Sequence, residues 1–357
     1  MREAAWLGGD WIPAPGDAAP AWAPQRFAPA AAFVRSGRLA LARAIASVVP
    51  PGATVLIPAL GCPALGQAAR AVGTRPAYYP STEALAPRWS ALRRLARELP
   101  AAAALLVHPA GHLLGDAAEP AGPDGIALIE DASFTLLNEA GAVTLGPPVT
   151  VAAAASLRKV LPLPAGGCWT RWGHRSTDEG QSSPDRFAAL RTEALAQPCG
   201  PERHRLLARA ERLLDADVLP GGLPAEAEAG LRGLEGAPGA KADGWRARCR
   251  ANWRQLTEEL GPTAGRPVFR ELPPAVCPSG VVLRHPDRSA LARHLLTCRI
   301  EAMLHWPVDA AAKAAMDGEE RRLAATLLTL PCDGRYGPAD MERIARACLA
   351  YDLHRRT

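Results

Sequence analysis

The sequence predicts an α/β protein whose main domain is built on a mostly parallel sheet. Short apolar runs, such as Thr54–Ile57 and Ile126–Glu130, alternate with segments whose apolar residues recur at helical spacing. Runs that are apolar along their whole length are typical of strands buried on both faces, as in a parallel sheet covered by helices. At 357 residues the chain is also long enough for a second, smaller domain.

The individual elements follow from this pattern in chain order. The residues before Phe33 are rich in Ala and Pro and predict an irregular arm. Arg38–Val49 predicts a helix that stops at Pro50-Pro51-Gly52. Strands are then expected at Thr54–Ile57, Arg75–Tyr79, Ala103–His108, Ile126–Glu130, Thr150–Ala154 and Gly167–Arg171, with helices at Pro63–Val72 and Arg88–Glu98. Sheets of this kind bind ligands at the carboxyl ends of their strands.

The second half of the chain predicts a domain boundary. Asp185 to Leu219 is helical and charged, and Pro220–Asp243 is rich in Gly, Pro, Ala and Glu. We therefore expect a large domain over residues 1–242 and a small α+β domain over 243–357. Helices of the small domain are expected at Trp245–Leu260, Arg288–Arg299 and Pro338–His354, and strands near Gly280–Arg284 and Thr326–Leu330.

The composition argues against several classes of protein. Hydrophobic residues make up 48% and charged residues 22%, as in ordinary soluble globular proteins. The net charge of +5 is dispersed, without the basic run of a nucleic-acid-binding arm. The longest apolar stretches, Ala101–Val107 and Val149–Ala155, are too short to cross a bilayer, and the N-terminus lacks the apolar core of a signal peptide. We expect a cytoplasmic protein with no nucleic-acid or membrane partner.

Metal and redox motifs are not expected. The eight cysteines contain no C-x-x-C pair, so most are expected to be small core residues in a reducing compartment. His108 and His112 are four residues apart, but Pro109 and Gly111 between them prevent an ordinary shared helix face. No third ligand is suggested by spacing, and no G-x-S-x-G motif indicates a serine hydrolase.

Lysine is scarce, and one lysine stands among chemically informative neighbours. Lysine occurs only at positions 159, 241 and 313. Arginine cannot replace lysine as an amine nucleophile, which favours a chemical role for a lysine that this arginine-rich chain retains. In Ser156-Leu157-Arg158-Lys159 the adjacent cation would lower the pKa of Lys159 and favour Schiff-base chemistry, whereas the alternative is a solvated surface lysine.

Two earlier motifs fit the same ligand, a pyridine aldehyde phosphate. In Ser36-Gly37-Arg38 a glycine opens a predicted helix whose amides and dipole would suit a phosphate, with the Ser156 hydroxyl as a second phosphate ligand; the alternative is a plain helix cap. Asp131 follows the apolar run Ile126–Ile129 and could pair with a pyridinium nitrogen, or could simply cap the next segment. The three motifs together favour bound pyridoxal 5′-phosphate.

These residues resemble the DegT/DnrJ/EryC1/StrS family of pyridoxal-phosphate-dependent aminotransferases of fold type I. The lysine motif is similar to that of a subgroup that reads Ser-Leu-Arg-Lys. The resemblance runs from about Phe33 to the C-terminus. Its motifs are Ser36-Gly37-Arg38-Leu39-Ala40, Leu56-Ile57-Pro58-Ala59-Leu60-Gly61-Cys62-Pro63, Tyr78-Tyr79, Ile129-Glu130-Asp131-Ala132, His305-Trp306-Pro307 and Leu330-Pro331-Cys332-Asp333-Gly334-Arg335-Tyr336.

The resemblance implies a role for each motif residue. Lys159 would form the Schiff base with the cofactor and later move a proton, and Asp131 would hold the pyridinium nitrogen. The backbone at Gly37 and Arg38, with the Ser156 hydroxyl, would bind the phosphate. The family resemblance also implies a homodimer with each active site at the subunit interface.

Four further positions come from the same resemblance. Cys62 stands where many relatives place an aromatic residue over the pyridine ring. Phe134 stands where the family usually has Gln or His able to reach the phenolic oxygen of the cofactor, and phenylalanine cannot donate that hydrogen bond. His305 and Trp306 are expected where the small domain approaches the substrate, although His305 could equally be a structural histidine.

The implied activity is transfer of an amino group from an amino-acid donor, glutamate-like, to a keto-sugar-like acceptor in polysaccharide or natural-product biosynthesis. Two alternatives stay open at this point. One is a pyridoxal-phosphate enzyme of another reaction type, such as dehydration, elimination or substitution. The other is a non-catalytic homologue that serves as a dimeric binding protein.

Overall fold

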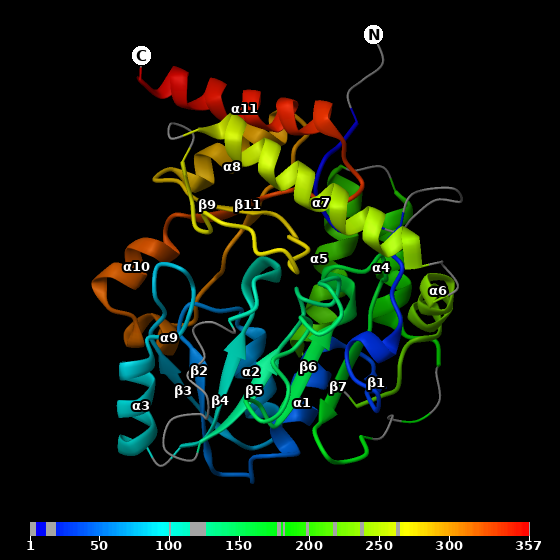
Figure 1. Ribbon diagram of the computed structural model, residues 1–357, viewed down its shortest axis with the longest axis vertical. Helices are drawn as coiled ribbons and strands as arrows, with labels where there is room; N and C mark the ends of the chain where they lie inside the picture. Colours follow the sequence, from blue (N-terminus) through cyan, green and yellow to red (C-terminus); the bar gives the residue numbers. More distant parts are fainter. Residues whose placement is uncertain are drawn as a thin grey trace.

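The computed structural model describes residues 5–11, 19–99, 101–114, 126–176, 180, 183–197, 200–216, 220–235, 239–261 and 265–356 of the chain. Within these ranges a seven-stranded sheet and a separate four-stranded sheet are surrounded by helices (Figure 1). The expected α/β fold, with a large sheet and a smaller α+β unit, is confirmed.

The large sheet is mostly parallel, as predicted. Its strand order is β1 (Ala32–Val34), β7 (Gly167–Arg171), β6 (Ala152–Ser156), β5 (Ala127–Asp131), β4 (Ala101–Val107), β2 (Thr54–Pro58) and β3 (Arg75–Tyr79). The pairs from β6 through to β3 are parallel, while β7 runs antiparallel to both β6 and β1. The sequence analysis missed β1, because three residues are too few to show a strand period.

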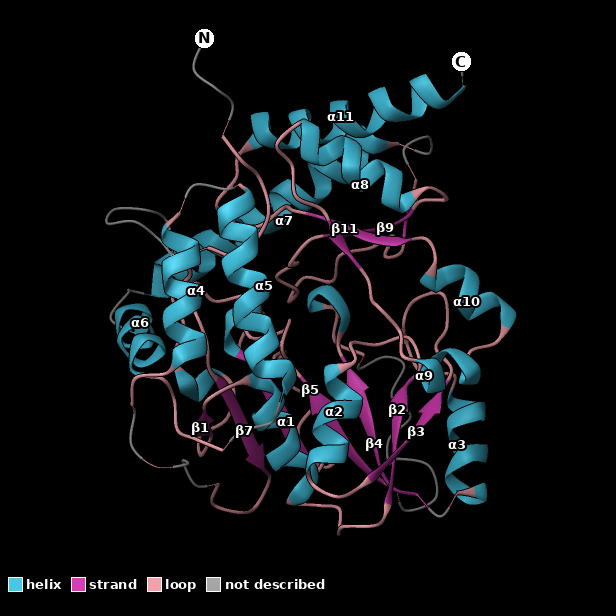
Figure 2. Cartoon of the chain, turned by 180° about the vertical axis from the view of Figure 1, so that it is seen from behind, coloured by secondary structure: helices cyan, strands magenta, loops and turns pink. Residues whose placement is uncertain are grey.

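Both faces of this sheet are covered by helices. The covering helices are α1 (Gly37–Ala46), α2 (Ala64–Ala71), α3 (Trp89–Glu98), α4 (Arg186–Ala196), α5 (Pro201–Ala216) and α6 (Ala225–Glu235). Ala103 and Leu105 of β4 belong to the core cluster with α1 and α2, whereas Ala104 and Leu106 belong to the cluster with α3. This alternation is what a strand buried on both faces requires. In Figure 2 α2 lies in front of the strands.

The smaller unit is built on an antiparallel sheet. Its strand order is β10 (Met303–Leu304), β11 (Leu327–Leu330), β9 (Val281–Arg284) and β8 (Arg266–Pro267). The helices α7 (Gly239–Leu260), α8 (Arg288–Thr297) and α11 (Pro338–Arg356) share its apolar core, and α9 (Ala310–Ala315) and α10 (Gly318–Ala324) lie between β10 and β11 in the chain. The predicted division between residues 242 and 243 falls within α7, and the division itself stays a prediction.

The N-terminal arm, here residues 5–11, lies against this smaller unit. Leu7 forms an isolated bridge with Ile300, and the Gly8 amide donates to the Tyr336 hydroxyl at 2.7 Å. Of the irregular arm expected before Phe33, residues 1–4 and 12–18 lie outside the described residues. The docked arm therefore brings the start of the chain next to its C-terminal third.

The described part of the chain offers few alternative sites. Its seven cysteines are free thiols, five of them buried, as expected for core residues; Cys199 lies outside the described residues. Among the described residues no group of three His, Cys, Asp or Glu side chains could hold a metal ion. No helix in the described ranges is long and apolar enough to span a membrane.

Candidate active site

A cavity of about 420 Å³ lies at the carboxyl ends of β4, β5 and β6. This size is within the range of pockets that bind small molecules, roughly 300–1,000 Å³. Of the predicted site residues, the cavity is lined by Gly37, Arg38, Cys62, Asp131, Phe134, Ser156, Lys159 and Trp306. His305 does not line it. Residues that are distant in sequence thus meet at the edge of the sheet where a ligand was expected.

The strand period explains why Asp131 and Ser156 reach this cavity. Ile129 of β5 and Ala154 of β6 both pack in the core cluster with α1 and α2. Side chains two residues apart on a strand point to the same face. Asp131 and Ser156, the last residues of their strands, therefore continue these two rows beyond the point where apolar residues fill the space.

A residue that the sequence analysis did not select, Ser133, connects these two strand ends. Its amide and its hydroxyl both donate to Oδ1 of Asp131, at 3.0 and 2.5 Å. Its hydroxyl oxygen also accepts from the Ser156 amide at 2.9 Å. Among the described residues both side-chain hydrogen bonds of Asp131 use Oδ1, so Ser133 orients the carboxylate without occupying Oδ2. A serine two residues after an aspartate fits an Asx turn, a pattern that could have drawn attention to it.

The N-terminus of α1 packs very closely against the end of β6. The Ser36 hydroxyl caps this helix by accepting from the Leu39 amide at 3.2 Å. A Cβ atom added to Gly37 would lie 2.3 Å from Cβ of Ser156, so no other residue fits without displacement. A Cβ on Gly167 would likewise lie 2.4 Å from the Ser36 carbonyl oxygen. Glycine at these positions brings the positive end of the α1 dipole to the cavity wall.

Lys159 ends the short 3-10 helix Leu157–Lys159 that follows β6, and its side chain is half-buried. Burial and the neighbouring Arg158 guanidinium lower the pKa of Lys159, while Cys62, Asp10 and Glu211 act in the opposite direction. A lowered pKa raises the fraction of neutral amine, which is the nucleophilic form. The sequence prediction that Arg158 would depress this pKa agrees with the geometry.

The floor and side of the cavity carry aromatic rings. Nζ of Lys159 lies 5.9 Å from the centroid of the Phe134 ring, within reach of a cation–π contact. Trp306, from the smaller unit, lines the cavity beside Pro307. These rings form part of the cavity wall near the lysine.

His305 lies behind Trp306 in a buried position. Its Nε2 is 2.5 Å from Oγ1 of Thr329, and its ring centroid is 4.5 Å from that of Trp306. Burial, with the positive charges of Lys159 and Arg288, lowers the pKa of His305 to about 4. His305 is therefore neutral near pH 7 and contacts the cavity through Trp306, which leaves its role as a substrate contact a prediction.

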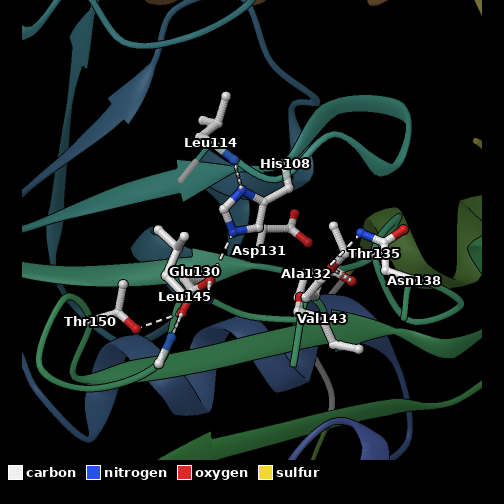
Figure 3. A network of polar contacts seen from close by, with 12 residues as sticks. His108, Leu114, Glu130, Asp131, Ala132, Thr135, Asn138, Val143, Leu145 and Thr150 are labelled. Carbon is white, nitrogen blue, oxygen red and sulfur yellow. Dashed lines mark hydrogen bonds and ion pairs between the residues drawn. The ribbon is translucent and has the colours of Figure 1, made fainter. Parts of the chain in front are cut away.

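On the opposite face of β5, Glu130 is completely buried in a polar network (Figure 3). Its carboxylate accepts from His108 Nε2 at 2.8 Å, Thr150 Oγ1 at 2.5 Å, and the Leu145 and Gly146 amides at 2.7 and 3.2 Å. Burial acts to raise the pKa of Glu130, but hydrogen bonds from His108, Thr150 and Leu145 lower it below the usual value. The network joins the loops that follow β4 and β5.

Solved structures of aminotransferases share this fold. The aminotransferase TlmJ from Streptoalloteichus hindustanus superposes with a TM-score of 0.65 at 16% identity, covering 99% of this chain and 100% of that one. A DegT DnrJ EryC1 StrS aminotransferase from Brucella abortus gives a TM-score of 0.60 at 16% identity, over 90% and 86% of the two chains.

A third structure, the sugar aminotransferase CalS13 from Micromonospora echinospora, gives a TM-score of 0.60 at 17% identity, over 91% of this chain and 89% of that one. Comparison with protein-family models found no match, and neither did a search of curated proteins. At these identities the likeness establishes the fold, and the activity has to be argued from the cavity.

Proposed function

We propose that this chain is a pyridoxal-phosphate-dependent aminotransferase of the DegT/DnrJ/EryC1/StrS type. It would move an amino group from an amino-acid donor, glutamate-like, to a keto-sugar-like acceptor in polysaccharide or natural-product biosynthesis. The observation that carries the proposal is the single cavity in which Lys159, Asp131 and the N-terminus of α1 meet. The sugar aminotransferase among the similar structures supports the choice of acceptor.

The residues present fit pyridoxal 5′-phosphate. An amine, a carboxylate and a helix N-terminus are the three kinds of group that its aldehyde, pyridine nitrogen and phosphate require. Lys159 would hold the aldehyde, Oδ2 of Asp131 the ring nitrogen, and the α1 backbone at Gly37 and Arg38 with the Ser156 hydroxyl the phosphate. When bound, the group supplies an electron sink for bonds to the substrate Cα atom.

The chain's own residues would then move the proton. The neutral amine of Lys159, favoured by its lowered pKa, would move a proton from the Cα atom of the donor to the C4′ atom of the cofactor, and in the second half of the cycle from C4′ to the corresponding carbon of the acceptor. Phe134 and Trp306 would exclude water from this transfer. A homodimer with the active site at the interface belongs to the proposal and rests on the family resemblance. A cytoplasmic location also belongs to it and rests on the sequence of the N-terminus and the pattern of cysteines.

The proposal is tested first with the wild-type protein. Purified chain incubated with pyridoxal phosphate is expected to show a visible absorption band that borohydride removes, and peptide mapping is expected to find the reduced cofactor on Lys159. Addition of glutamate, with 2-oxoglutarate release measured by chromatography, then tests amino transfer. A folded protein that never develops the band would contradict the proposal and favour a non-catalytic dimeric binding protein.

Phe134 favours one second candidate, a pyridoxal-phosphate enzyme of another reaction type. Its ring borders the lysine amine but offers no hydrogen bond to a phenolic oxygen. Loss of that hydrogen bond would change the electronics of the bound cofactor and thereby the reaction that it supports. A cofactor band that stays unchanged with every amino donor, while a substrate is dehydrated or eliminated, would select this candidate over transamination.

Gly37 gives a specific prediction about cofactor affinity. We expect Gly37→Ala to weaken pyridoxal phosphate binding at least about tenfold, because the added methyl group has to displace Ser156 and with it the proposed phosphate site. Fluorescence titration measures the dissociation constant. The matched control is Gly233→Ala in α6, where an added Cβ meets no atom within 4 Å. Equal affinities for the Gly37 variant and wild type would place the phosphate elsewhere.

A further inference from the structure

We infer that Asp10 of the N-terminal arm is a positioning residue for Lys159, on which its charge acts both directly and by neutralising Arg158. The lysine would thereby respond to whether the arm is docked on the smaller unit. The inference takes Lys159 as the reacting group, and in that respect it rests on the proposed function.

The arm is held in place by contacts with the smaller unit. Besides the bridge between Leu7 and Ile300, the Gly8 amide donates to the Tyr336 hydroxyl at 2.7 Å. Arg335 donates to the Gly9 carbonyl oxygen at 3.1 Å. Asp10, the next residue, accepts a hydrogen bond from Arg191 of α4.

There Asp10 completes a network of two carboxylates and two guanidinium groups. Arg191, 1% exposed, binds both Asp10 and Glu211 and donates through Nε to the Pro164 carbonyl oxygen at 2.8 Å. Arg158 approaches the same two acids, at 3.2 Å for Glu211 and 3.6 Å for Asp10. Each of the two guanidinium groups thus lies beside both carboxylates. Removal of either carboxylate would leave two positive charges facing a single negative one.

Lys159 follows Arg158 directly and lies among charges from several elements. Arg158 on its own 3-10 helix, Asp10 on the arm, Glu211 on α5 and Cys62 after β2 all act on it, and its charge in turn acts on His305 after β10. Burial opposes ionisation of Asp10, but Arg191 and Arg158 lower its pKa to about 2. Asp10 is therefore an anion throughout the range in which a lysine titrates.

The test is competitive labelling of the full-length chain, freed of cofactor, with acetic anhydride over a range of pH. Since the chain has three lysines, mass spectrometry resolves Lys159 cleanly, with exposed Lys313 as the internal standard. In Asp10→Asn the midpoint of the Lys159 profile is expected to move to lower pH, because the protonated amine loses a neighbouring anion. On the low-pH side of the profile, labelling should rise about threefold. Asp10→Glu should restore the wild-type profile.

Two further variants separate positioning from a general change of charge or fold. Glu301→Gln removes a carboxylate beside the arm whose ion-pair partner is His204, not Arg158, and should leave the profile unchanged. Tyr336→Phe removes the acceptor for the Gly8 amide without changing any charge, and should move the midpoint in the same direction as Asp10→Asn. An unchanged profile in Asp10→Asn, or an equal shift in Glu301→Gln, would overturn the inference. Because no cofactor is present, this result is independent of whether the proposed function holds.

Discussion

Replacement of Lys159 by alanine is expected to abolish amino transfer, with a fall in turnover of at least about a thousandfold. The variant loses both the amine that would hold the cofactor aldehyde and the base that would move the Cα proton, and proton transfer by a placed group alone contributes about 10²- to 10⁴-fold. Lys159→Arg should fail equally, since a guanidinium keeps the positive charge but cannot act as an amine nucleophile. The borohydride-sensitive absorption band measures the loss of cofactor attachment, and the turnover of the amino donor measures the loss of proton transfer.

The matched control is Lys313→Ala on α9, which removes an exposed lysine that does not line the cavity and should leave the absorption band and the turnover intact. A Lys159→Ala protein that kept the borohydride-sensitive band would assign the covalent attachment to another amine. A Lys159→Ala protein that lost the band yet kept normal turnover would separate the activity from the cofactor.

Loss of the Glu130 carboxylate should have the largest effect on stability. In Glu130→Ala the buried His108 ring, the Thr150 hydroxyl and two amides lose their acceptor together. Breaking a buried ionisable pair in this way costs about 3–5 kcal/mol of the free energy of unfolding. Urea denaturation followed by circular dichroism measures it. Glu98→Ala, which removes an exposed acid paired with Arg94 on the same helix, is the control and should change little.

The same network predicts how stability depends on pH. Because the pKa of Glu130 is lowered on folding, its contribution is present above the ordinary carboxyl value of 4.5 and is lost as the pH falls through the folded value. The difference in the free energy of unfolding between wild type and Glu130→Gln should therefore be largest near pH 7. It should become smaller as the pH falls below about 4.5. A difference that grew on acidification would mean that Glu130 is protonated in the folded protein.

The central strands of the large sheet, such as Thr54–Pro58, could be predicted from sequence because their burial on both faces leaves a continuous apolar run. Arg75–Tyr79 and Gly167–Arg171 were predicted with the bounds that the structure shows. The short strands β1, β8 and β10 were not predicted, since two or three residues have no measurable period. The helix α6 was also missed, because it lies within a Gly- and Pro-rich stretch that indicated only a boundary.

Part of the cavity followed from sequence because its chemistry is local. Lys159 and Arg158 are adjacent, and Asp131 and Ser156 end apolar runs, so their neighbours in the chain already indicated a position at the carboxyl edge of the sheet. Ser133 was not selected because its importance depends on the distance between two strand ends. Asp10 was missed for a similar reason, since its partners Arg158 and Arg191 are far along the chain and meet it only in the fold.

Glu130 and Asp131 are consecutive residues, yet the pleat sends one into the interior and the other into the cavity. Natural selection can therefore act on them separately. In a mutational scan that records both cellular abundance and activity, substitutions at 130 should deplete the protein itself, whereas substitutions at 131 should leave abundance intact and remove activity alone. A lineage that abandoned catalysis would be free to change Asp131 long before it could change its neighbour.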